Sequence, residues 1–323
     1  MPHPPRPALL LAERLRARIA GSGPLRFDHW VEACLYDEAG GFYARGARVG
    51  RRGAFATAPT LHPAFGDAVA AEVVADRTAA STVVEAGPGD GTLAERLLAV
   101  TDDLVLLERA GGMRALQLAR LGGRVRFVER PDELRPFDGA IVANEVLDAL
   151  PFRLLRWPHE VVVTCGPDGR FREELVATDL EPPVPDPRRG GRYAVRPAIG
   201  EFLAALVRPL RRGRVVLIDY GGDAAAVHDG RRDPVRTYVA GSAGASALNA
   251  PGAQDITADV DFAAVRSAAS RLGLREVTYE SQPDWLRRHG AVVRPLSSAT
   301  DDDWRLCLLL DPALPYQVLV LER

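Results

Sequence analysis

From residue 81 onward, short apolar runs alternate with segments of helical spacing, and this alternation restricts the fold more than any other feature. The runs are TVVEA at 82–86, LVLLE at 104–108, VRFVE at 125–129, GAIVA at 139–143 and RVVLID at 214–219. Strands of a parallel sheet that is covered on both faces are apolar along their whole length. We therefore predict an α/β fold with a mostly parallel sheet between two layers of helices.

Two later runs extend this sheet, LREVTYE at 274–280 and YQVLVLE at 316–322. No helix follows the last run, so we expect it to insert antiparallel to its neighbours. Between the fourth and fifth strands, the runs FRLLRW, EVVVTC and RFREELV lie close together, and the turn GPDG separates the last two. These runs predict an inserted β-meander at about residues 151–197.

The first 80 residues are predicted to form a separate, mainly helical section. LLLAERLRARIA at 9–20 and RFDHWVEACLY at 26–36 both have helical spacing. A loop rich in Gly, Arg, Ala and Pro follows at 40–59, and a loop of this length is usually functional. We expect the chain to divide into this section, residues 1–80, and a core of residues 81–323.

The composition excludes several classes of protein. The 323 residues, 47% of them hydrophobic, suffice for a sizeable core, and a formal charge of −2 favours neither nucleic acid nor a membrane surface. Cys34, Cys165 and Cys307 stand far apart, so we expect no disulfide framework and no metal site. No run approaches the ~20 apolar residues of a membrane span, and ALLLA near the N-terminus is too short for a signal peptide. These features favour a cytoplasmic protein.

The segment VVEAGPGDGT at 83–92 places Gly87, Gly89 and Gly91 at alternate positions between a strand and a helix. Such glycines let the backbone turn sharply and let a flat ligand approach without meeting a Cβ atom. The spacing lacks the third glycine of the dinucleotide fingerprint at its usual place, so it is a weak signal by itself.

The charges beside these glycines indicate the ligand class. A phosphate would gain ~0.3–1 kcal/mol from the helix dipole, whereas a carboxylate about 4 Å away costs up to ~4 kcal/mol at an effective dielectric of 20. Glu85 and Asp90 would therefore repel a pyrophosphate, and a cationic ligand such as S-adenosylmethionine (SAM) is preferred. Glu108 ends the second strand, where an acid can accept hydrogen bonds from both ribose hydroxyls. Alternatively, Glu85 pairs with an arginine and Glu108 is merely solvated.

The fourth strand leads into ANEVLDALPF at 143–152, which contains a second group of polar residues. Asn144, Glu145 and Asp148 follow the carboxyl end of a central parallel strand, which is the ligand-binding edge of such a sheet. If the turn is helical, Asn144 and Asp148 share one face. The alternative is that Asn144 only caps a short helix that Pro151 ends. We favour a catalytic role.

Seven ordered blocks resemble the MidA-like SAM-dependent methyltransferases, whose members include an enzyme that methylates a protein arginine. The blocks are DEAGGFYA, GAFATAPTLHPAFGD, EAGPGDGT, ANEVLDALP, VLIDYGG, PGAQDITADVDF and QVLVLE. The resemblance spans Gly40 to Glu322. It implies a class I methyltransferase fold, which is Rossmann-like, with the helical section in front and the meander as a lid over the substrate cleft. It also implies a protein or small-molecule methyl acceptor.

Thr57 and Pro59 are implied by the resemblance alone, whereas spacing, charge and resemblance together assign the other candidate site residues. The residues expected to hold the cofactor SAM are Thr57, Pro59, Glu85, Gly87, Gly89, Gly91, Glu108 and Asn144. The expected catalytic residues are Asn144, Glu145 and Asp148, and either acid could orient the nucleophile and accept its proton. Methyl transfer from a sulfonium needs no metal.

Some positions depart from the family pattern. The family commonly has an acid at Ala54 and Thr60, a glutamate at Ala194 and an arginine at Asp90. The loss of three carboxylates near the cleft mouth weakens the expectation of an arginine substrate. The alternatives are a small-molecule methyltransferase, a scaffold or assembly chaperone that binds SAM without turnover, and a nicotinamide oxidoreductase, which the glycine spacing disfavours. We expect no nucleic-acid or membrane partner, and a homodimer is left open.

Several further polar residues have two interpretations. His62 is either a general base or a loop residue, and the helix-starting motif DDDW at 301–304 is expected to be solvated. Asp219 and Tyr220 either face the cleft or only turn the chain. The residues expected to brace a loop rather than touch substrate are Gln254, Asp255 and Thr257.

Overall fold

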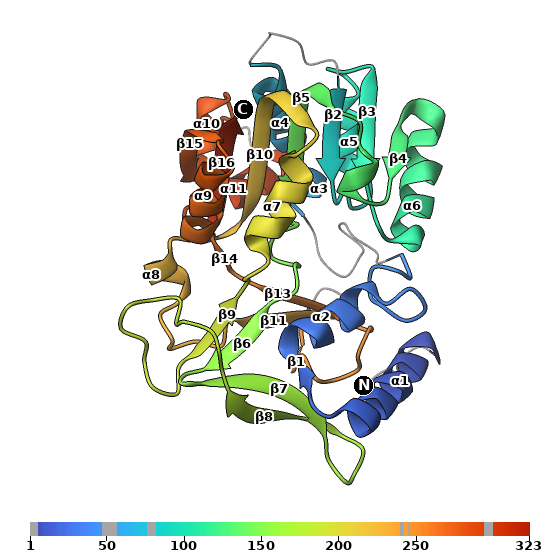
Figure 1. The fold of residues 1–323 in the computed structure, drawn as a ribbon. Helices are drawn as coiled ribbons and strands as arrows, with labels where there is room; N and C mark the ends of the chain where they lie inside the picture. The colour runs from blue at the N-terminus through green and yellow to red at the C-terminus, as the bar shows by residue number, and fades with distance from the viewer. Residues whose placement is uncertain (1–5, 47–56, 76–81, 240–241, 245, 294–299) are drawn as a thin grey trace.

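The structure is a computed structural model that describes residues 6–46, 57–75, 82–239, 242–244, 246–293 and 300–323. Figure 1 shows a large sheet flanked by helices in the upper part of the molecule and smaller sheets, also accompanied by helices, in the lower part. The carboxyl ends of the central strands of the large sheet point toward the lower part.

The large sheet has the order β15-β16-β10-β5-β2-β3-β4, with β14 paired to β10. Its strands are β2 (Thr82–Ala86), β3 (Asp103–Leu107), β4 (Arg126–Val128), β5 (Phe137–Asn144), β10 (Leu210–Gly222), β14 (Val260–Asp261), β15 (Arg275–Ser281) and β16 (Tyr316–Glu322). Strands β4, β3, β2, β5 and β10 are mutually parallel, whereas β16 is antiparallel to both β10 and β15. The predicted α/β sheet and its antiparallel last strand are confirmed.

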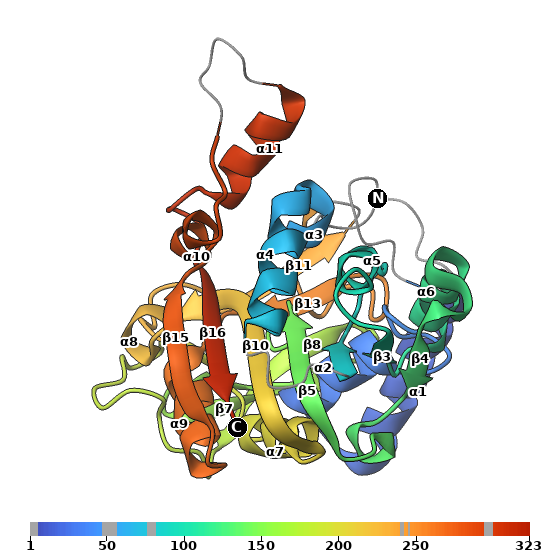
Figure 2. The same ribbon diagram turned by 90° about the horizontal axis from the view of Figure 1, so that it is seen from above.

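Helices cover both faces of this sheet, which explains the continuous apolar runs. Alternate residues of one strand enter different cores, so that Val83 packs with one cluster and Val84 with the other. The helices are α3 (Ala58–Leu61), α4 (Pro63–Val74), α5 (Thr92–Leu97), α6 (Gly111–Leu121), α7 (Ile199–Val207), α8 (Ala224–Val227), α9 (Phe262–Arg271), α10 (Gln282–Arg288) and α11 (Asp301–Leu309). Figure 2 shows α4 on one side of the sheet and α7 and α9 on the other.

The lower part of the molecule, which we call the cap, combines segments that are distant in sequence. It contains α1 (Arg6–Ser22), α2 (Phe27–Tyr36), β1 (Leu25–Arg26), β6 (Arg153–Arg156), β7 (His159–Cys165), β8 (Phe171–Ala177), β9 (Arg192–Val195), β11 (Val235–Val239), β12 (Ser242–Ala243) and β13 (Asp255–Ala258). The strands β6, β7 and β8 are the predicted meander, but β9 extends its sheet beyond β6, and the short β1 pairs with β7. The three-stranded sheet β12-β11-β13 was not predicted.

A third apolar cluster holds the cap together and joins it to the core. It includes Trp30 of α2 and Val163 of β7, together with Ile256 of β13 and Met113 of α6. The cap therefore packs against the helix that follows β3, and this contact places α2 and β13 opposite the carboxyl ends of the central strands.

Candidate active site

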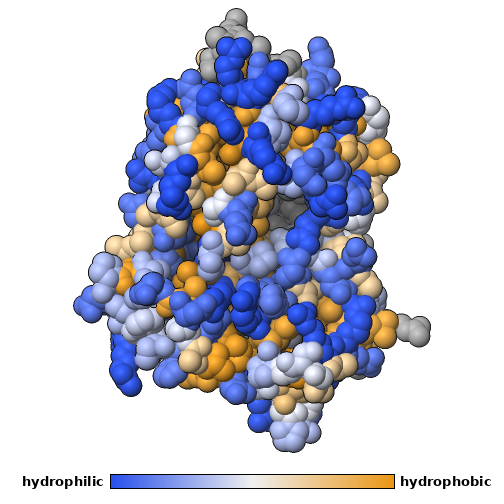
Figure 3. All heavy atoms as spheres, in the orientation of Figure 1, coloured by the Kyte–Doolittle hydropathy of each residue, from blue (hydrophilic) through white to orange (hydrophobic). Residues whose placement is uncertain are grey.

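A cavity of about 260 Å³ lies between the carboxyl ends of the central strands and the cap. Figure 3 shows that this face of the molecule is hollowed between the upper and lower parts. The expected site residues that line the cavity are Thr57, Pro59, Glu85, Gly87, Gly89, Glu108, Asn144, Glu145 and Asp148. Gly91 is not among the lining residues, because it begins α5 as the N-cap.

The loop between β2 and α5 needs glycine for its conformation. Gly87 and Gly89 have φ angles of +63° and +55°, in the left-handed region that side chains with a Cβ rarely adopt. A Cβ on Gly87 would lie 2.7 Å from Cγ2 of Val146, which is too close. Gln117 of α6 donates a hydrogen bond to the Gly89 carbonyl at 2.9 Å and so fixes the loop.

The two acids beside this loop differ in their surroundings. Asp90 is paired with Arg120 at 2.8 Å and accepts the Thr92 N–H at 3.0 Å. Glu85 is 3% exposed, its Oε2 has no hydrogen-bond partner, and no ion pair reaches it in the described part of the chain. Burial, reinforced by Asp90, raises the pKa of Glu85 well above its usual value. Glu85 is therefore suited to a cationic ligand group.

Glu108 is a fixed acceptor at the end of β3, rather than a solvated strand-end acid. It is 8% exposed, its Oε1 accepts the Ala110 N–H at 2.8 Å, and its Oε2 accepts a hydrogen bond from Gln117 at 3.1 Å. Burial raises its pKa. Gln117 thus connects the glycine loop to Glu108. Sequence analysis did not identify Gln117, and the only available signal was its polar side chain on the buried side of a helix.

The turn after β5 is not helical, so the condition for Asn144 and Asp148 to share a helix face is not met. Glu145 has a φ angle of +53°, and its N–H donates to the Ile218 carbonyl of β10 at 2.8 Å. The N–H groups of Leu147 and Asp148 both donate to Asp219 Oδ2, at 2.9 and 3.1 Å. Because β10 takes these N–H groups, they are not available to close a helical turn.

Glu145 lines the cavity and is held by two donors. Its Oε1 accepts hydrogen bonds from the Ala58 N–H at 3.3 Å and the Asn144 side chain at 3.2 Å. Burial and the nearby Asp148 raise the pKa of Glu145 to about 8. The Oδ1 atom of Asn144 is buried and has no hydrogen-bond partner. The segment at Thr57 thus closes over the strand end, as a cofactor-pocket loop would.

Asp148 and Tyr220 form a buried hydrogen-bonded pair, in which the Tyr220 hydroxyl donates to Asp148 Oδ2. The Oδ1 atom of Asp148 has no hydrogen-bond partner. Burial raises the pKa of Asp148, and the bond from Tyr220 and the charge of Arg196 partly counteract it. Two residues of β10 had two interpretations from the sequence. Tyr220 lines the cavity, whereas Asp219 braces the turn after β5.

Asp255 lines the cavity, which corrects the expectation that it only braces a loop. Its Oδ1 accepts a hydrogen bond from the Tyr43 hydroxyl at 3.1 Å. Gln254 does brace the loop, since it donates to the carbonyls of Ser246 and Asn249 at 2.6 and 2.7 Å. His62 accepts the Ala64 N–H as the N-cap of α4 and does not line the cavity.

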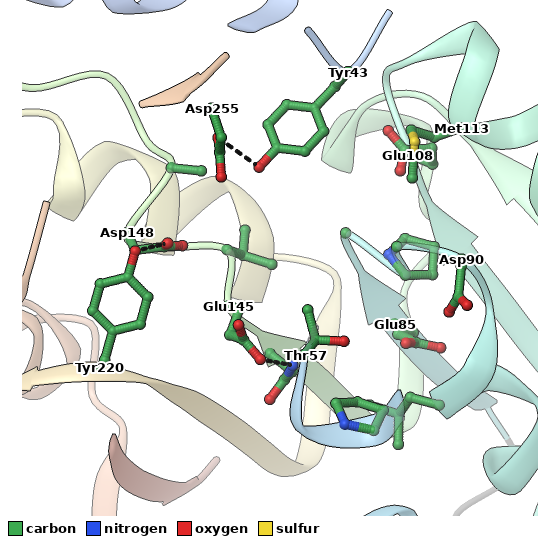
Figure 4. Close-up of a pocket in the computed structure, with 18 of the residues that line it drawn as sticks. Tyr43, Thr57, Glu85, Asp90, Glu108, Met113, Glu145, Asp148, Tyr220 and Asp255 are labelled. Carbon is green, nitrogen blue, oxygen red and sulfur yellow. Dashed lines mark hydrogen bonds between the residues drawn. The ribbon is translucent and has the colours of Figure 1, made fainter. Parts of the chain in front are cut away.

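Figure 4 shows that the lining residues fall into two groups. Glu85, Asp90 and Glu108 lie on one side, and the pairs Asp148–Tyr220 and Asp255–Tyr43 lie on the other. Five of the seven tyrosines of the chain line the cavity, namely Tyr36, Tyr43, Tyr220, Tyr238 and Tyr316. Sequence analysis singled out Tyr220 alone, because the others come from the cap and from the start of β16.

Acids cluster in this cavity, and burial raises the pKa of Glu85, Glu145 and Asp255, so that they ionise fully only when a cation binds. No ion pair is recorded there for Glu85, Glu108, Glu145, Asp148 or Asp255, although most exposed acids of the chain have an arginine partner. Buried charges without a partner are costly. The unpartnered oxygens of Glu85 and Asn144 and the glycine loop therefore fit a ligand such as SAM, which is cationic and has no phosphate.

This fold and this cavity define the class I SAM-dependent methyltransferases. A family model described as "Putative S-adenosyl-L-methionine-dependent methyltransferase" matches residues 68–279. The chain belongs to this family and is a SAM-dependent methyltransferase.

Known proteins of similar structure and sequence agree with this assignment. A Burkholderia thailandensis protein solved with bound S-adenosyl-homocysteine is 28% identical with a TM-score of 0.90, and the match covers 100% of this chain and 95% of that chain. "Protein arginine methyltransferase NDUFAF7, mitochondrial" of Rattus norvegicus is 25% identical over 309 residues, which are 80% of this chain and 69% of that protein. Its Drosophila melanogaster homolog is 26% identical over 315 residues, 81% of this chain and 70% of that protein. The resemblance to MidA-like methyltransferases and the cofactor SAM are confirmed.

The departures from the family pattern have a limited effect on the cavity. Ala54 lies outside the described residues. Thr60 donates its hydroxyl to the Thr57 carbonyl at 2.8 Å, and Ala194 is 3% exposed within β9. Neither Thr60 nor Ala194 lines the cavity. The carboxylates of Glu145 and Asp148, from the turn after β5, and of Asp255, at the start of β13, do line it.

Proposed function

We propose that the protein transfers the methyl group of SAM to the guanidinium of a protein arginine. One observation carries this proposal. Glu145, Asp148 and Asp255 each have one oxygen held by a donor of the protein, and no donor from the described residues is recorded on the other. A guanidinium supplies several N–H donors and a positive charge, which such carboxylates need.

The cofactor would occupy the side of the cavity that is formed by β2 and β3. We propose that Gly87 and Gly89 lie against its methionine part, that Glu85 binds its ammonium and that Glu108 accepts hydrogen bonds from its ribose. Thr57, Pro59 and Asn144 would close the pocket around it, and Gly91 would orient the start of α5. When bound, SAM supplies an electrophilic methyl group on its sulfonium.

The acceptor would occupy the side that is lined by Asp148, Asp255 and the tyrosines. Carboxylates attract cations, and so do the faces of aromatic rings. This lining therefore favours a guanidinium over a neutral metabolite. The relatives that are named protein arginine methyltransferases support the same acceptor at 25% identity. The departures at Thr60 and Ala194 do not argue against it, because neither position lines the cavity.

Asp148 is the residue that we propose orients the acceptor nitrogen and accepts its proton. Its Oδ1 is free, and the hydrogen bond from Tyr220 and the charge of Arg196 favour its ionised form. Glu145, with a pKa of about 8, keeps its proton at neutral pH until a cation approaches. Asn144 holds one oxygen of Glu145 and so positions it.

Incubation with isotopically labelled SAM tests the proposal. The acceptors are the blocked peptides acetyl-Gly-Arg-Gly-amide and acetyl-Gly-Lys-Gly-amide, and the proteins and small metabolites of a cell extract. We expect the label on arginine nitrogens, located by tandem mass spectrometry. Label on small metabolites alone would indicate the small-molecule alternative. SAM binding without transfer to any acceptor would indicate the scaffold alternative.

A further inference from the structure

We propose that Asp255, held by Tyr43, is the residue that selects a guanidinium acceptor, by forming with Asp148 a pair of carboxylates that bind two edges of one planar cation. This inference rests on the proposed function, and it assigns to Asp255 a role that its sequence context did not indicate.

The position of Asp255 supports this role. It is 3% exposed, begins β13 and lies opposite Tyr238 of β11. Its Oδ1 accepts hydrogen bonds from the Tyr43 hydroxyl at 3.1 Å and from the Ile256 N–H at 3.0 Å. No donor within the described ranges is recorded for its Oδ2. One oxygen is therefore fixed by the protein, and the other is available to a ligand.

Asp148 has the same arrangement. Its Oδ2 accepts the Tyr220 hydroxyl, and its Oδ1 is buried without a partner. Figure 4 shows both tyrosine–aspartate pairs on the same side of the cavity, away from Glu85 and Glu108. Two carboxylates, each with one oxygen satisfied by a neutral hydroxyl, thus lie on the acceptor side.

The backbone holds these two carboxylates in a fixed relation. The Ala258 N–H, at the end of β13, donates to the Asp148 carbonyl at 3.3 Å. Nη2 of Arg196 donates to the carbonyls of both Asp148 and Ala258, each at 2.7 Å. Arg196 follows β9, so the guanidinium of a cap residue bridges the strand that carries Asp255 and the turn that carries Asp148. A pre-organised pair of this kind loses little entropy when a ligand binds.

Tyrosines complete the wall of this subsite. Tyr43 stacks on Tyr36 with ring centroids 5.6 Å apart and an interplanar angle of 22°. The Tyr36 hydroxyl donates to the carbonyl of Ala149, the neighbour of Asp148, at 3.1 Å. The stacked rings therefore extend from Asp255 to the turn that carries Asp148, and they present flat surfaces to the cavity.

The difference between the arginine and lysine side chains explains why the two carboxylates would select arginine. Guanidinium is planar and presents five N–H donors in a rigid fork, whereas an ammonium is a compact, strongly hydrated point charge. Two fixed carboxylates can engage separate edges of the fork, but an ammonium gains less from the second carboxylate. Loss of Asp255 should therefore weaken arginine binding more than lysine binding.

Titration calorimetry on the full chain saturated with S-adenosyl-homocysteine tests the inference. The probes are acetyl-Gly-Arg-Gly-amide and acetyl-Gly-Lys-Gly-amide. We expect the wild type to prefer the arginine peptide by at least about tenfold, and Asp255→Asn to weaken arginine binding by about tenfold to hundredfold, the range for a hydrogen bond to a charged group. The variant should keep the wild-type affinity for S-adenosyl-homocysteine. Asp186→Asn, at an exposed position, is the matched control.

Tyr43→Phe provides a second, milder variant, since it removes only the donor to Asp255. We expect it to reduce the preference for arginine severalfold while the thermal midpoint stays close to that of the wild type. If Asp255→Asn does not fold, an unchanged preference in Tyr43→Phe overturns the inference, as does an unchanged preference in a folded Asp255→Asn. If the wild type with bound S-adenosyl-homocysteine binds neither peptide, the proposed acceptor class fails instead.

Discussion

Two tyrosine–aspartate pairs determine the character of the acceptor side at the scale of single residues. In each pair a neutral hydroxyl donates to one carboxylate oxygen, Tyr220 to Asp148 and Tyr43 to Asp255. A neutral donor stabilises the ionised form without cancelling its charge. The pairs thus fix the side chains while the negative charge stays available to a cationic acceptor.

Binding of a guanidinium should depend on pH. Burial and Asp148 raise the pKa of Asp255 to about 7 and that of Glu145 to about 8. Below these values the acids carry protons and attract a cation less. The affinity for acetyl-Gly-Arg-Gly-amide should therefore rise between pH 6 and pH 9, by up to roughly tenfold per pH unit for each acid that must lose its proton. Calorimetry in buffers of different ionisation enthalpy should detect the released protons, and an affinity that does not change with pH would contradict the account.

Replacement of a loop glycine should separate ligand binding from folding. Gly89 has a φ angle of +55° and lines the cavity, so Gly89→Val places a branched side chain in the path of the cofactor. The left-handed backbone costs about 1–2 kcal/mol of stability for such a residue. Gly290→Val is the matched control, because Gly290 has a φ angle of +85° with nothing within 4 Å.

Both variants should lose similar stability in urea titrations, but only Gly89→Val should lose the binding of S-adenosyl-homocysteine, by at least about tenfold, the equivalent of 1.4 kcal/mol. Equal cofactor affinity in the two variants would remove the glycine loop from the site.

Asp148→Asn tests the proposed base. The amide keeps the shape of the side chain but accepts no proton, so the rate of methyl transfer should fall by about 10²–10⁴-fold. The affinity for S-adenosyl-homocysteine should change little. Single-turnover kinetics with the arginine peptide measures the effect, and an unaltered rate would exclude Asp148 from proton transfer.

At the scale of elements, the turn after β5 shows how neighbouring strands determine the site. Its N–H groups donate to Asp219 and to the Ile218 carbonyl, both on β10, instead of to carbonyls of its own segment. The turn is therefore attached to the adjacent strand, and Glu145 and Asp148 can both reach the cavity without a helix.

Asp219 should contribute measurably to this attachment. Asp219→Ala leaves the N–H groups of Leu147 and Asp148 without an acceptor, and the loss should cost about 1–3 kcal/mol of unfolding free energy. Asp219→Asn retains one carbonyl acceptor and should cost less. Urea titration measures both values. Equal stability of the alanine variant and the wild type would show that other partners replace Asp219.

The sequence predicted those elements whose signal is local. The strands of the large sheet are buried on both faces, so each appears as an apolar run, and the acids at their ends follow directly. In contrast, β1 and β12 have only two residues each and are defined by their partners β7 and β11. The sequence left the conformation of the Glu145 turn open for the same reason, because distant acceptors on β10 determine it. Tyr43 and Asp255 belong to segments 212 residues apart, and only the fold brings them together.

At the scale of the whole molecule, the cavity lies where the cap meets the sheet. The Arg196 bridge to Asp148 and Ala258 and the contact between Tyr36 and Ala149 both cross this boundary. Within the described residues, no helix is long and apolar enough to cross a bilayer. The division of the chain near residue 80 stays a prediction. The sequence left a homodimer open, and size-exclusion chromatography with light scattering measures the oligomeric state.

The crystal structure of the full chain with S-adenosyl-homocysteine and acetyl-Gly-Arg-Gly-amide is the most direct measurement of the central claim. We expect S-adenosyl-homocysteine to lie beside Gly87, Glu85 and Glu108. The guanidinium should lie within hydrogen-bonding distance, about 3 Å, of both Asp148 and Asp255. S-adenosyl-homocysteine bound on the acceptor side of the cavity, beside Asp148, would contradict the account. A guanidinium bound away from both aspartates would also contradict it.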